Sequence, residues 1–265
     1  LIGFNIFSSR ALVLASGAQR SYLNLSGLNT LILSSYDKLK DSKERYQGMQ
    51  LNTVTGNIKL NKIDFSYNKS DFLFRNLNIS INSGQVFCIS GSNGDGKTTL
   101  SKILMGILEP SAGEVLVDGT NLNKLSLKWW KKQVSYIPQT PNILNSSIMD
   151  NILLGNDKLN EQEVSRLLQT VGLDQKLKKT SLTILDPIED NLSKGVKKKI
   201  HYARALAQNS KIFIIDDPFG YLDNQGVEIV QKLIESLKRA NKTIILFSDN
   251  NILSNVIDEN ITIGN

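Results

Sequence analysis

A glycine-rich segment at residues 91–98 constrains the fold and the chemistry of this chain more than any other feature. The segment fits the pattern G-x-x-x-x-G-K-[ST] in full. It follows the apolar run Val86–Ser90, which predicts a buried strand, and it precedes a helical pattern that begins at Lys97. A strand, a glycine-rich turn and a helix N-terminus in this order predict a loop that binds phosphate groups. The alternative is a glycine-rich turn that binds nothing.

The residue types in the loop suit this chemistry, with one exception. Glycines let backbone N–H groups wrap around the phosphates of a nucleotide, Lys97 reaches the outer phosphates, and the Thr98 hydroxyl binds Mg²⁺. Asp95 is an unfavourable negative charge in this loop unless its side chain points away from the phosphates. The residues predicted to hold the nucleotide are Gly91, Ser92, Asn93, Gly94, Asp95, Gly96, Lys97, Thr98 and Thr99.

A second element of this chemistry follows much later in the chain. Residues 212–215 are apolar, and Asp216 ends the run with a carboxylate. A carboxylate at the C-terminal end of a buried strand is suited to hold Mg²⁺, so Asp216 is the predicted ligand. Asp217 comes next and is predicted to orient or deprotonate the attacking water. The alternative is that two adjacent acids merely end a strand.

Composition narrows the class of protein only slightly. The 265 residues suffice for one large domain, or for a domain with an appended segment. A formal charge of +6 suits an anionic nucleotide, a membrane surface or a nucleic acid about equally well. The lone Cys88 lies in an apolar run, which favours buried packing over reactivity. No uninterrupted apolar stretch reaches the ~18 residues that a membrane-spanning helix needs.

The hydrophobic pattern divides the chain into two parts. Residues 19–43 repeat apolar side chains at helical spacing and become more charged toward their end, and a polar linker covers residues 42–56. Residues 58–67 then alternate apolar and polar side chains, as a half-buried strand does. We therefore expect one part at residues 1–50 and a second domain at residues 51–265.

The second domain alternates strands and helices. Further strands are predicted at residues 78–81, 86–90, 114–117, 134–138, 212–216 and 243–248. Helices are predicted at residues 97–108, 161–171, 197–208 and 225–240. This alternation predicts an α/β fold with a parallel sheet covered on both faces, in which the early strands form antiparallel hairpins.

From about residue 56 onward, the chain resembles the nucleotide-binding domains of ATP-binding cassette (ABC) transporters, because several motifs occur in that family's order. Tyr67 matches the aromatic residue that stacks on adenine, and Gln139 matches the glutamine that contacts Mg²⁺ and water and links the site to the membrane domain. Residues 192–196 lie at the signature motif, where Ser193 and Gly195 offer contacts to ATP bound on the partner subunit. Further matches are residues 110–114, 118–119, 151–152 and 222–223.

The resemblance implies a P-loop NTPase core of the ABC type. It implies a parallel sheet, an N-terminal antiparallel β subdomain and an α-helical subdomain inserted at about residues 140–208. ATP and Mg²⁺ are the implied cofactors, and a second nucleotide-binding domain, identical or different, is an implied partner. The other implied partner is a transmembrane domain in the same polypeptide. This partner places the chain at the cytoplasmic face of the inner membrane. Nucleic acid is not an expected partner, because no base-reading or stacking constellation is present.

The first part of the chain carries a weaker resemblance. Residues 1–50 resemble the end of the last membrane helix, the connecting helix and the linker of exporters that drive type I secretion. This match suggests a protein or a peptide as the transported substrate. The alternative is a cytoplasmic helix with one apolar face.

Three departures from the family's pattern predict slow hydrolysis. Asp217 stands where the family usually has Glu, and its shorter carboxylate reaches less far toward a water that must be held within ~3 Å. Asp249 stands where a His usually touches the terminal phosphate, so we expect repulsion between two anions. In the signature motif, Lys194 replaces Gly and Val196 replaces Gln. The predicted catalytic residues are Asp217, Gln139 and Asp249, and the predicted metal ligands are Thr98, Gln139 and Asp216.

Several interpretations remain open. The basic run at residues 197–199 suits a nucleic-acid or lipid patch, although a solvated face of a helix is the favoured interpretation. The chain is interpreted as an active transport ATPase, as an ATP-binding regulatory half that hydrolyses little, or as a soluble ABC ATPase. The helix at residues 19–43 and the exporter-like residues 148–155 disfavour the soluble class.

Overall fold

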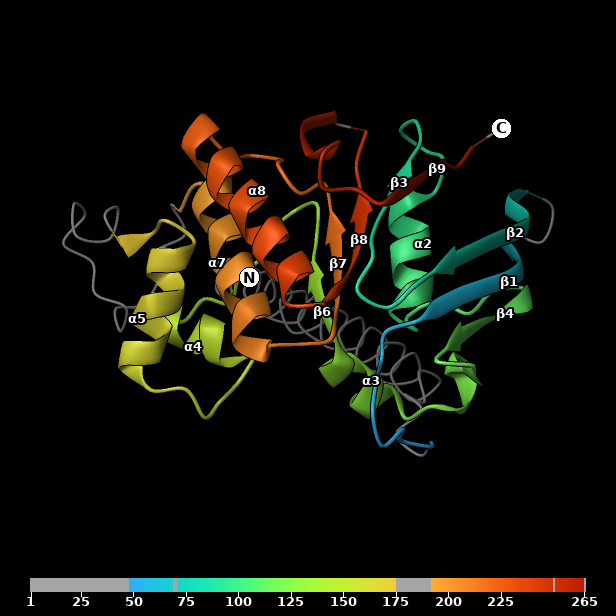
Figure 1. The fold of residues 1–265 in the computed structure, drawn as a ribbon, viewed down its shortest axis with the longest axis horizontal. Coiled ribbons are helices and arrows are strands. Elements are labelled where there is room, and N and C mark those ends of the chain that lie inside the picture. The colour runs from blue at the N-terminus through green and yellow to red at the C-terminus, as the bar shows by residue number, and fades with distance from the viewer. Residues whose placement is uncertain (1–47, 69–70, 175–191, 250, 265) are drawn as a thin grey trace, which may run out of the picture. The chain divides into compact units, whose positions relative to one another are not determined.

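Short runs of branched and aromatic residues form the central sheet. The computed structural model describes residues 48–68, 71–174, 192–249 and 251–264. Its parallel strands lie in the order β6-β7-β8-β3-β9 (Figure 1). Their bounds are Val86–Ser90 (β3), Val134–Ile137 (β6), Ile212–Asp216 (β7), Thr243–Phe247 (β8) and Glu259–Thr262 (β9). Because every neighbouring pair is parallel, the carboxyl ends of these strands lie along one edge of the sheet.

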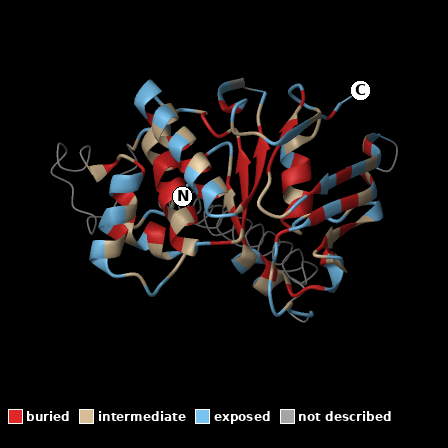
Figure 2. Cartoon of the chain, in the orientation of Figure 1, coloured by how far each residue is buried: buried red, intermediate tan, exposed pale blue. Residues whose placement is uncertain are grey.

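Both faces of this sheet are covered, as strand β7 illustrates. All of its residues are buried, although their side chains alternate between the two faces. Ile212 and Ile214 belong to one apolar core, whereas Phe213 and Ile215 belong to another. Figure 2 shows the central strands buried along their length. Burial on both faces explains why the sequence of this strand is continuously apolar rather than alternating.

One core lies between the parallel sheet and an antiparallel sheet of order β2-β1-β4-β5. Helix α2 packs in the same core through Leu100 and Ile103. Trp130 of helix α3 is also buried there, and its indole N–H donates to the Leu104 carbonyl at 3.0 Å. The bounds are Ile58–Ser66 (β1), Phe72–Ile81 (β2), Lys97–Leu104 (α2), Ala112–Val117 (β4), Thr120–Asn121 (β5), Leu122–Lys124 (a 3-10 turn) and Leu127–Gln133 (α3).

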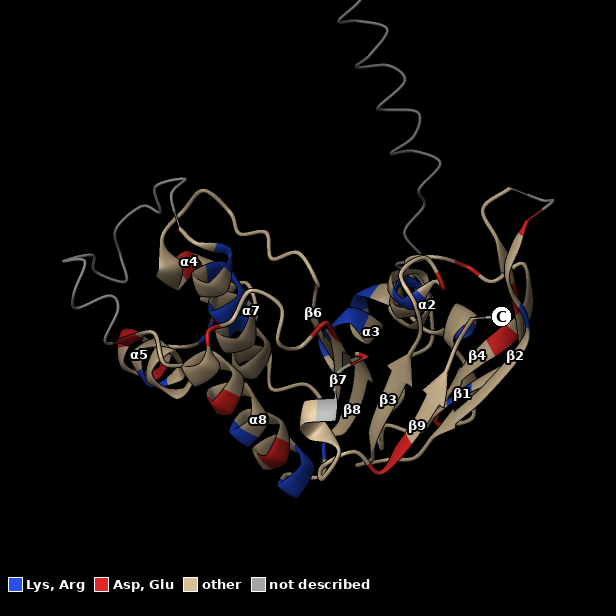
Figure 3. Ribbon diagram, turned by 90° about the horizontal axis from the view of Figure 1, so that it is seen from above, with Lys and Arg blue, Asp and Glu red and all other residues tan. Residues whose placement is uncertain are grey.

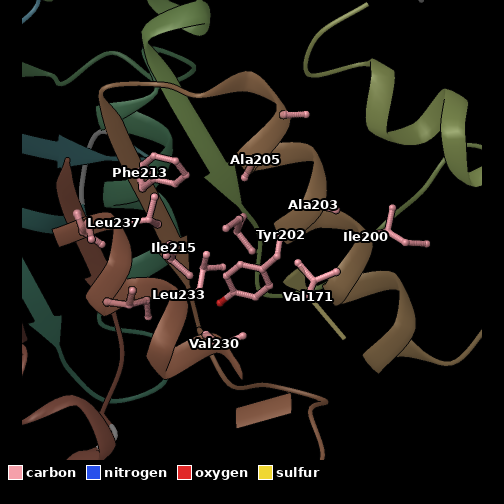
Figure 4. Close-up of a cluster of buried hydrophobic side chains, with 14 of the residues drawn as sticks. Val171, Ile200, Tyr202, Ala203, Ala205, Phe213, Ile215, Val230, Leu233 and Leu237 are labelled. Carbon is pink, nitrogen blue, oxygen red and sulfur yellow. The ribbon is translucent and has the colours of Figure 1, made fainter. Parts of the chain in front are cut away.

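Helices α7 (Lys194–Gln208) and α8 (Asn224–Arg239) cover the opposite face of the parallel sheet. Figure 4 shows Tyr202 of α7 in the same buried cluster as Phe213 of β7 and Leu233 of α8. Helices α4 (Ile148–Leu153) and α5 (Glu161–Thr170) lie beside α7 on the side away from the sheet (Figure 1). A 3-10 turn at Asn251–Leu253 precedes β9.

The predicted α/β class, with one parallel and one antiparallel sheet, is confirmed. Some predicted ends were wrong. Strand β2 begins at Phe72 rather than at residue 78. Helix α2 ends at Leu104 rather than at residue 108, because Gly106 adopts a left-handed conformation with φ 70° that turns the chain. Helix α7 begins at Lys194 rather than at residue 197, because the Ser193 side chain accepts the Val196 N–H and caps the first turn.

Other predictions were incomplete or lie outside the described residues. Helices α3 and α4 were not predicted, because 7 and 6 residues are too few to display a helical period. The helix at residues 19–43, nearly all of residues 1–50 and residues 175–191 of the helical subdomain lie outside the described part. The domain boundary near Leu51 therefore stays a prediction. Within the described residues, no helix combines the length and the apolarity that crossing a membrane requires.

Asp118, in the turn between β4 and β5, ties down the segment that enters β1. Its carboxylate accepts the N–H groups of Thr55 at 2.8 Å, Asn57 at 2.9 Å and Gly56 at 3.2 Å, and it also accepts the Thr55 hydroxyl. Partial burial opposes ionisation, but the hydrogen bonds from Thr55, Asn57 and Gly56 outweigh it and lower the pKa of Asp118. Its charged form therefore stabilises the folded state.

We predict that Asp118→Asn lowers the free energy of unfolding by about 1 kcal/mol at pH 7, because an amide oxygen accepts fewer of these bonds. Asn tolerates the left-handed φ of 47° at this position, so the change reports on the carboxylate. Because the pKa of Asp118 is lower in the folded state than in the unfolded state, this loss of stability is fully present above the unfolded-state pKa. It is absent once the pH falls below the folded-state pKa. Urea denaturation at pH 7 and at low pH measures both. Asp157→Asn, at an exposed position, is the control, and equal effects at the two positions contradict the prediction.

Candidate functional site

The loops that follow the parallel strands enclose an open depression of about 800 Å³ at the carboxyl edge of the sheet. Most of the predicted site residues line it, and they come from loops that are far apart in the sequence. The predicted residues in its wall are Ser92, Asn93, Gly94, Gly96, Lys97, Thr98, Thr99, Gln139, Asp216, Asp217 and Asp249. Phe247 and Ser248 complete the wall and were not predicted.

The glycine-rich loop delivers the N-terminus of α2 to this depression. Gly96 caps the helix with φ 95°, a left-handed conformation that favours glycine. A Cβ at this position would lie 2.6 Å from Phe74 and 2.7 Å from Leu73, so there is also no room for a side chain. Because glycine has no side chain, Gly96 offers no side-chain acceptor to the backbone N–H groups in the first turn of the helix. The N-terminus of α2 is therefore suited to an anion.

Thr98 and Asp216 form the centre of the predicted metal site. The Thr98 hydroxyl donates to Asp216 Oδ2 at 2.9 Å, so the two predicted ligands are already adjacent. Burial raises the pKa of Asp216, while the bond from Thr98 and the positive charge of Lys198 oppose this rise. Hydroxyl and carboxylate oxygens are hard donors, which suits Mg²⁺. The residues present therefore fit the ion that the resemblance implies.

Asp249 binds the lysine of the loop. Its Oδ1 accepts the Gly91 N–H at 2.7 Å, and its Oδ2 accepts the Lys97 ammonium at 2.9 Å. Lys97 also donates to the carbonyl oxygens of Gly91 and Ser92. Burial opposes ionisation of Asp249, but Gly91 and Lys97 outweigh it and lower its pKa. We therefore expect Asp249 to oppose phosphate binding in two ways. Its carboxylate repels the phosphate, and it also binds the Lys97 ammonium that the phosphate would otherwise contact.

Asp95 is turned away from the phosphate-facing side of the loop. Its carboxylate accepts the Ser92 N–H at 2.6 Å. It lines a second depression of about 860 Å³, on the side of the loop where Gly264 and the C-terminal strand lie, and does not line the first. Asp95 therefore meets the condition set by the sequence analysis, that its side chain points away from the predicted phosphate site.

Tyr67 lies at the margin of the site. Its hydroxyl and the Thr99 hydroxyl are 2.9 Å apart, which places the tyrosine beside the first turn of α2. Its ring meets the Phe65 ring edge to face, at 5.0 Å between centroids. The side chain is 63% exposed, so most of the ring is available to a planar ligand.

Asp217 has a strained backbone and an engaged side chain. Its φ of 50° is left-handed, and its Oδ1 accepts the Gly220 N–H at 3.1 Å. It lines the depression, as a group that orients water must do. The hydrogen bond to Gly220 holds the carboxylate within its own turn, which restricts its reach.

The signature-motif residues Ser193 and Gly195 do not line the depression. Ser193 caps α7, and a Cβ at Gly195 would lie 2.6 Å from the Tyr221 carbonyl oxygen. The Lys194 ammonium lies 4.7 Å from the centroid of the Tyr221 ring, within the range of a cation–π interaction. These residues therefore form a separate surface with the loop that follows β7.

The interpretation of residues 197–199 as a solvated face was wrong for two of the three lysines. Lys198 is 0% exposed and Lys199 is 4% exposed. Figure 3 shows Lys and Arg residues on α7, and this helix packs against α4 and α5. The signal was present in the sequence, because Lys198 precedes the core residue Tyr202 by four positions and therefore shares its helix face.

Buried polar groups on α7 bind the chain at the carboxyl ends of β6 and β7, and sequence reasoning missed them. Lys198 donates to the Pro138 carbonyl at 2.7 Å and to the Asp216 carbonyl at 3.0 Å. His201 Nε2 lies 2.7 Å from the Asn142 carbonyl oxygen. Burial lowers the pKa of Lys198 to about 8, although Asp217 and Asp216 oppose this change.

Comparison with known proteins gives one consistent family. The profile of a family described as "ABC transporter" matches residues 74–220. ABC transporter B family member 13 of Arabidopsis thaliana is 30% identical over 211 residues, which are 78% of this chain and 17% of that protein. The alpha-hemolysin translocation ATP-binding protein HlyB of Escherichia coli is 30% identical over 251 residues, which are 93% of this chain and 36% of that protein. The chain thus spans a minor part of the length of these relatives.

A solved structure shares the fold. It is described as a bacterial Atm1-family ABC exporter with ATP bound, and it matches with a TM-score of 0.78 at 19% sequence identity. The match covers 89% of this chain and 42% of that chain. At this identity the likeness establishes the arrangement of elements.

His201 generates a prediction about stability. Burial lowers its pKa to about 4, and the positive charges of Arg204 and Lys198 act in the same direction, whereas the bond to Asn142 opposes them. Since the folded pKa is below the unfolded value, the unfolded state binds more protons as pH falls. We predict that the free energy of unfolding drops by about 2 kcal/mol from this residue between pH 7.5 and pH 5. His201→Gln, whose amide reaches the Asn142 carbonyl without titrating, removes this component. Chemical denaturation at both pH values measures it, and identical pH dependence in the two proteins rules it out.

Proposed function

We propose, because the chain belongs to the ABC transporter family, that it is the ATP-binding domain of an exporter that couples ATP binding and hydrolysis to transport. The observation that carries the proposal is the 2.9 Å contact between Thr98 and Asp216, at the point where Lys97 and the N-terminus of α2 meet the acidic end of β7. A hydroxyl, a carboxylate, an ammonium and a helix N-terminus together suit a magnesium nucleotide.

The residues take distinct roles in this proposal. Residues 91–98 bind the phosphates, and Tyr67 stacks on the adenine through its exposed ring. Thr98, Asp216 and Gln139 hold Mg²⁺, which neutralises phosphate charge when bound. Asp217 orients the attacking water from its place in the wall of the depression.

The proposed partners lie on two surfaces. Ser193 and Gly195, which stand apart from the depression, contact ATP held by a second nucleotide-binding domain. A transmembrane domain in the same polypeptide carries the substrate across the membrane, with this chain on its cytoplasmic side. Similarity to HlyB over 93% of the chain supports a protein or a peptide as the substrate. We also propose the division into residues 1–50 and 51–265.

A second candidate is an ATP-binding domain that hydrolyses slowly. The contact of Asp249 with Lys97 and the contact of Asp217 with Gly220 favour it. The first contact occupies the cation that binds the terminal phosphates, and the second restricts the carboxylate that orients water. Both candidates bind ATP, and they differ in the rate of hydrolysis.

Nucleotide binding and single-turnover hydrolysis test the proposal. We predict that Lys97→Ala weakens Mg²⁺-ATP binding at least about tenfold, because a cation that contacts phosphate is lost. Lys232→Ala, at an exposed position on α8, is the control.

Asp217→Asn is expected to slow hydrolysis about tenfold or more with unchanged affinity, if this carboxylate orients the water. Titration calorimetry and quenched-flow kinetics give the two readouts. Absence of ATP binding by the unaltered chain refutes the function, and a rate unchanged in Asp217→Asn favours the slowly hydrolysing candidate.

Asp249 allows a prediction in the opposite direction. Asp249→Asn is expected to tighten Mg²⁺-ATP binding about three- to tenfold, because the amide still accepts the Gly91 N–H but no longer competes for Lys97. The gain shrinks at high salt, since the Asp249 side chain is 56% exposed. Asp157→Asn makes the same change of net charge at an exposed position outside the site. Equal affinities in these two variants contradict the proposed competition.

A further inference from the structure

Lys198 is a buried cation whose bonds run to two different loops of the site. Its ammonium donates to the Pro138 carbonyl at 2.7 Å, directly before Gln139, and to the Asp216 carbonyl at 3.0 Å. The side chain is 0% exposed. Because Pro138 follows β6 and Asp216 ends β7, one ammonium group joins the carboxyl ends of two neighbouring strands.

The burial of this lysine requires an explanation. Removing an ammonium from water carries a large desolvation cost, which hydrogen bonds and nearby opposite charges only partly offset. An apolar side chain of similar length would fill the same space without that cost. The two carbonyl oxygens and the nearby carboxylates of Asp216 and Asp217 compensate the charge here. What a lysine offers at this place, and an apolar side chain does not, is directed bonding to both loops.

The next turn of α7 repeats the arrangement. His201 Nε2 lies 2.7 Å from the Asn142 carbonyl oxygen, and the Tyr202 hydroxyl donates to the Pro218 carbonyl at 2.8 Å. Residues at i, i+3 and i+4 face the same side of a helix, so Lys198, His201 and Tyr202 form one stripe. This stripe binds the loop of Gln139 twice and the loop of Asp217 twice. A rigid shift of α7 therefore displaces both loops together.

We propose that Lys198 is a positioning residue of the hydrolytic site, which holds Gln139 and the acidic end of β7 at a fixed separation and ties both to α7. Lys198 acts through the backbone of these loops and does not touch the nucleotide. Since Ser193 caps the same helix, the position of the signature surface is transmitted to the loops that bind Mg²⁺ and water. The role in hydrolysis rests on the proposed ATPase function, whereas the connection between the loops does not.

Three variants separate hydrogen bonding from charge and from packing. Lys198→Met keeps an unbranched side chain, one heavy atom shorter, and removes every donor. Lys198→Gln is neutral and keeps N–H donors for the carbonyl oxygens. Lys197→Met makes the same change one position earlier, where the side chain is not fully buried, and serves as the control.

The first measurement is amide hydrogen exchange without added nucleotide. In Lys198→Met, exchange is expected to accelerate at least about tenfold in both residues 138–142 and residues 216–220, and to stay unchanged in α5. Lys198→Gln and Lys197→Met should match the unaltered chain. Should Lys198→Met not fold, Lys198→Ser, whose hydroxyl is too short to reach either carbonyl, replaces it with the same expectation. Unchanged exchange in either loop overturns the proposal.

The second measurement is single-turnover hydrolysis at saturating Mg²⁺-ATP. Lys198→Met is expected to lower the rate at least about tenfold while the dissociation constant for ATP changes less than about threefold, and Lys198→Gln restores most of the rate. A Met variant with an unaltered rate, or a folded Gln variant as slow as the Met variant, overturns the role in hydrolysis. If exchange changes as expected but the unaltered chain does not hydrolyse ATP, the proposed ATPase function fails and the connection between the loops stands.

Discussion

Two-sided burial of the parallel sheet is the constraint on which the site depends. The helices and the antiparallel sheet cover both faces of the central strands β3, β7 and β8, so these strands carry polar side chains only at their ends. Strand direction then decides which end carries the site, because the loops after β3, β6, β7 and β8 all emerge at the carboxyl edge. The glycine at position 96 follows from the same packing, since α2 enters its core where Phe74 and Leu73 leave no space for a side chain.

Several polar groups at the proposed nucleotide site are bonded to other groups of the chain. Lys97 is bonded to Asp249, the Thr98 hydroxyl to Asp216, and the Lys198 ammonium to two carbonyl oxygens. In the proposed function, binding of phosphate and Mg²⁺ exchanges some of these bonds for new ones, and the affinity is the difference between the two sets. A site of this kind is held in shape by its own polar contacts, at the cost of part of the binding energy that free donors would supply.

Sequence patterns predicted those features that local spacing encodes. The glycine-rich loop, the apolar strand that ends in Asp216 and the alternation of strands and helices are local, and the structure agrees with them. Contacts between distant residues were not predictable in this way. The Lys97–Asp249 bond joins residues that are 152 positions apart, and the Lys198–Pro138 bond spans 60 positions. A run of lysines also resembles a solvated surface by composition alone, and only the helical period reveals that two of them face the core.

The three departures from the family's pattern lie at different places in the fold. Asp217 lies in the turn that ends at Gly220, and Lys194 of α7 packs on Tyr221 directly after it, so both positions involve the loop that follows β7. Asp249 lies in another loop, against the glycine-rich segment. None of the three alters the Thr98–Asp216 contact, the N-terminus of α2 or the glycine at its cap. In the proposed function, the elements that fit a magnesium nucleotide are therefore kept, while the groups assigned to the terminal phosphate and the attacking water differ, so the capacity to bind ATP would not determine the rate of its hydrolysis.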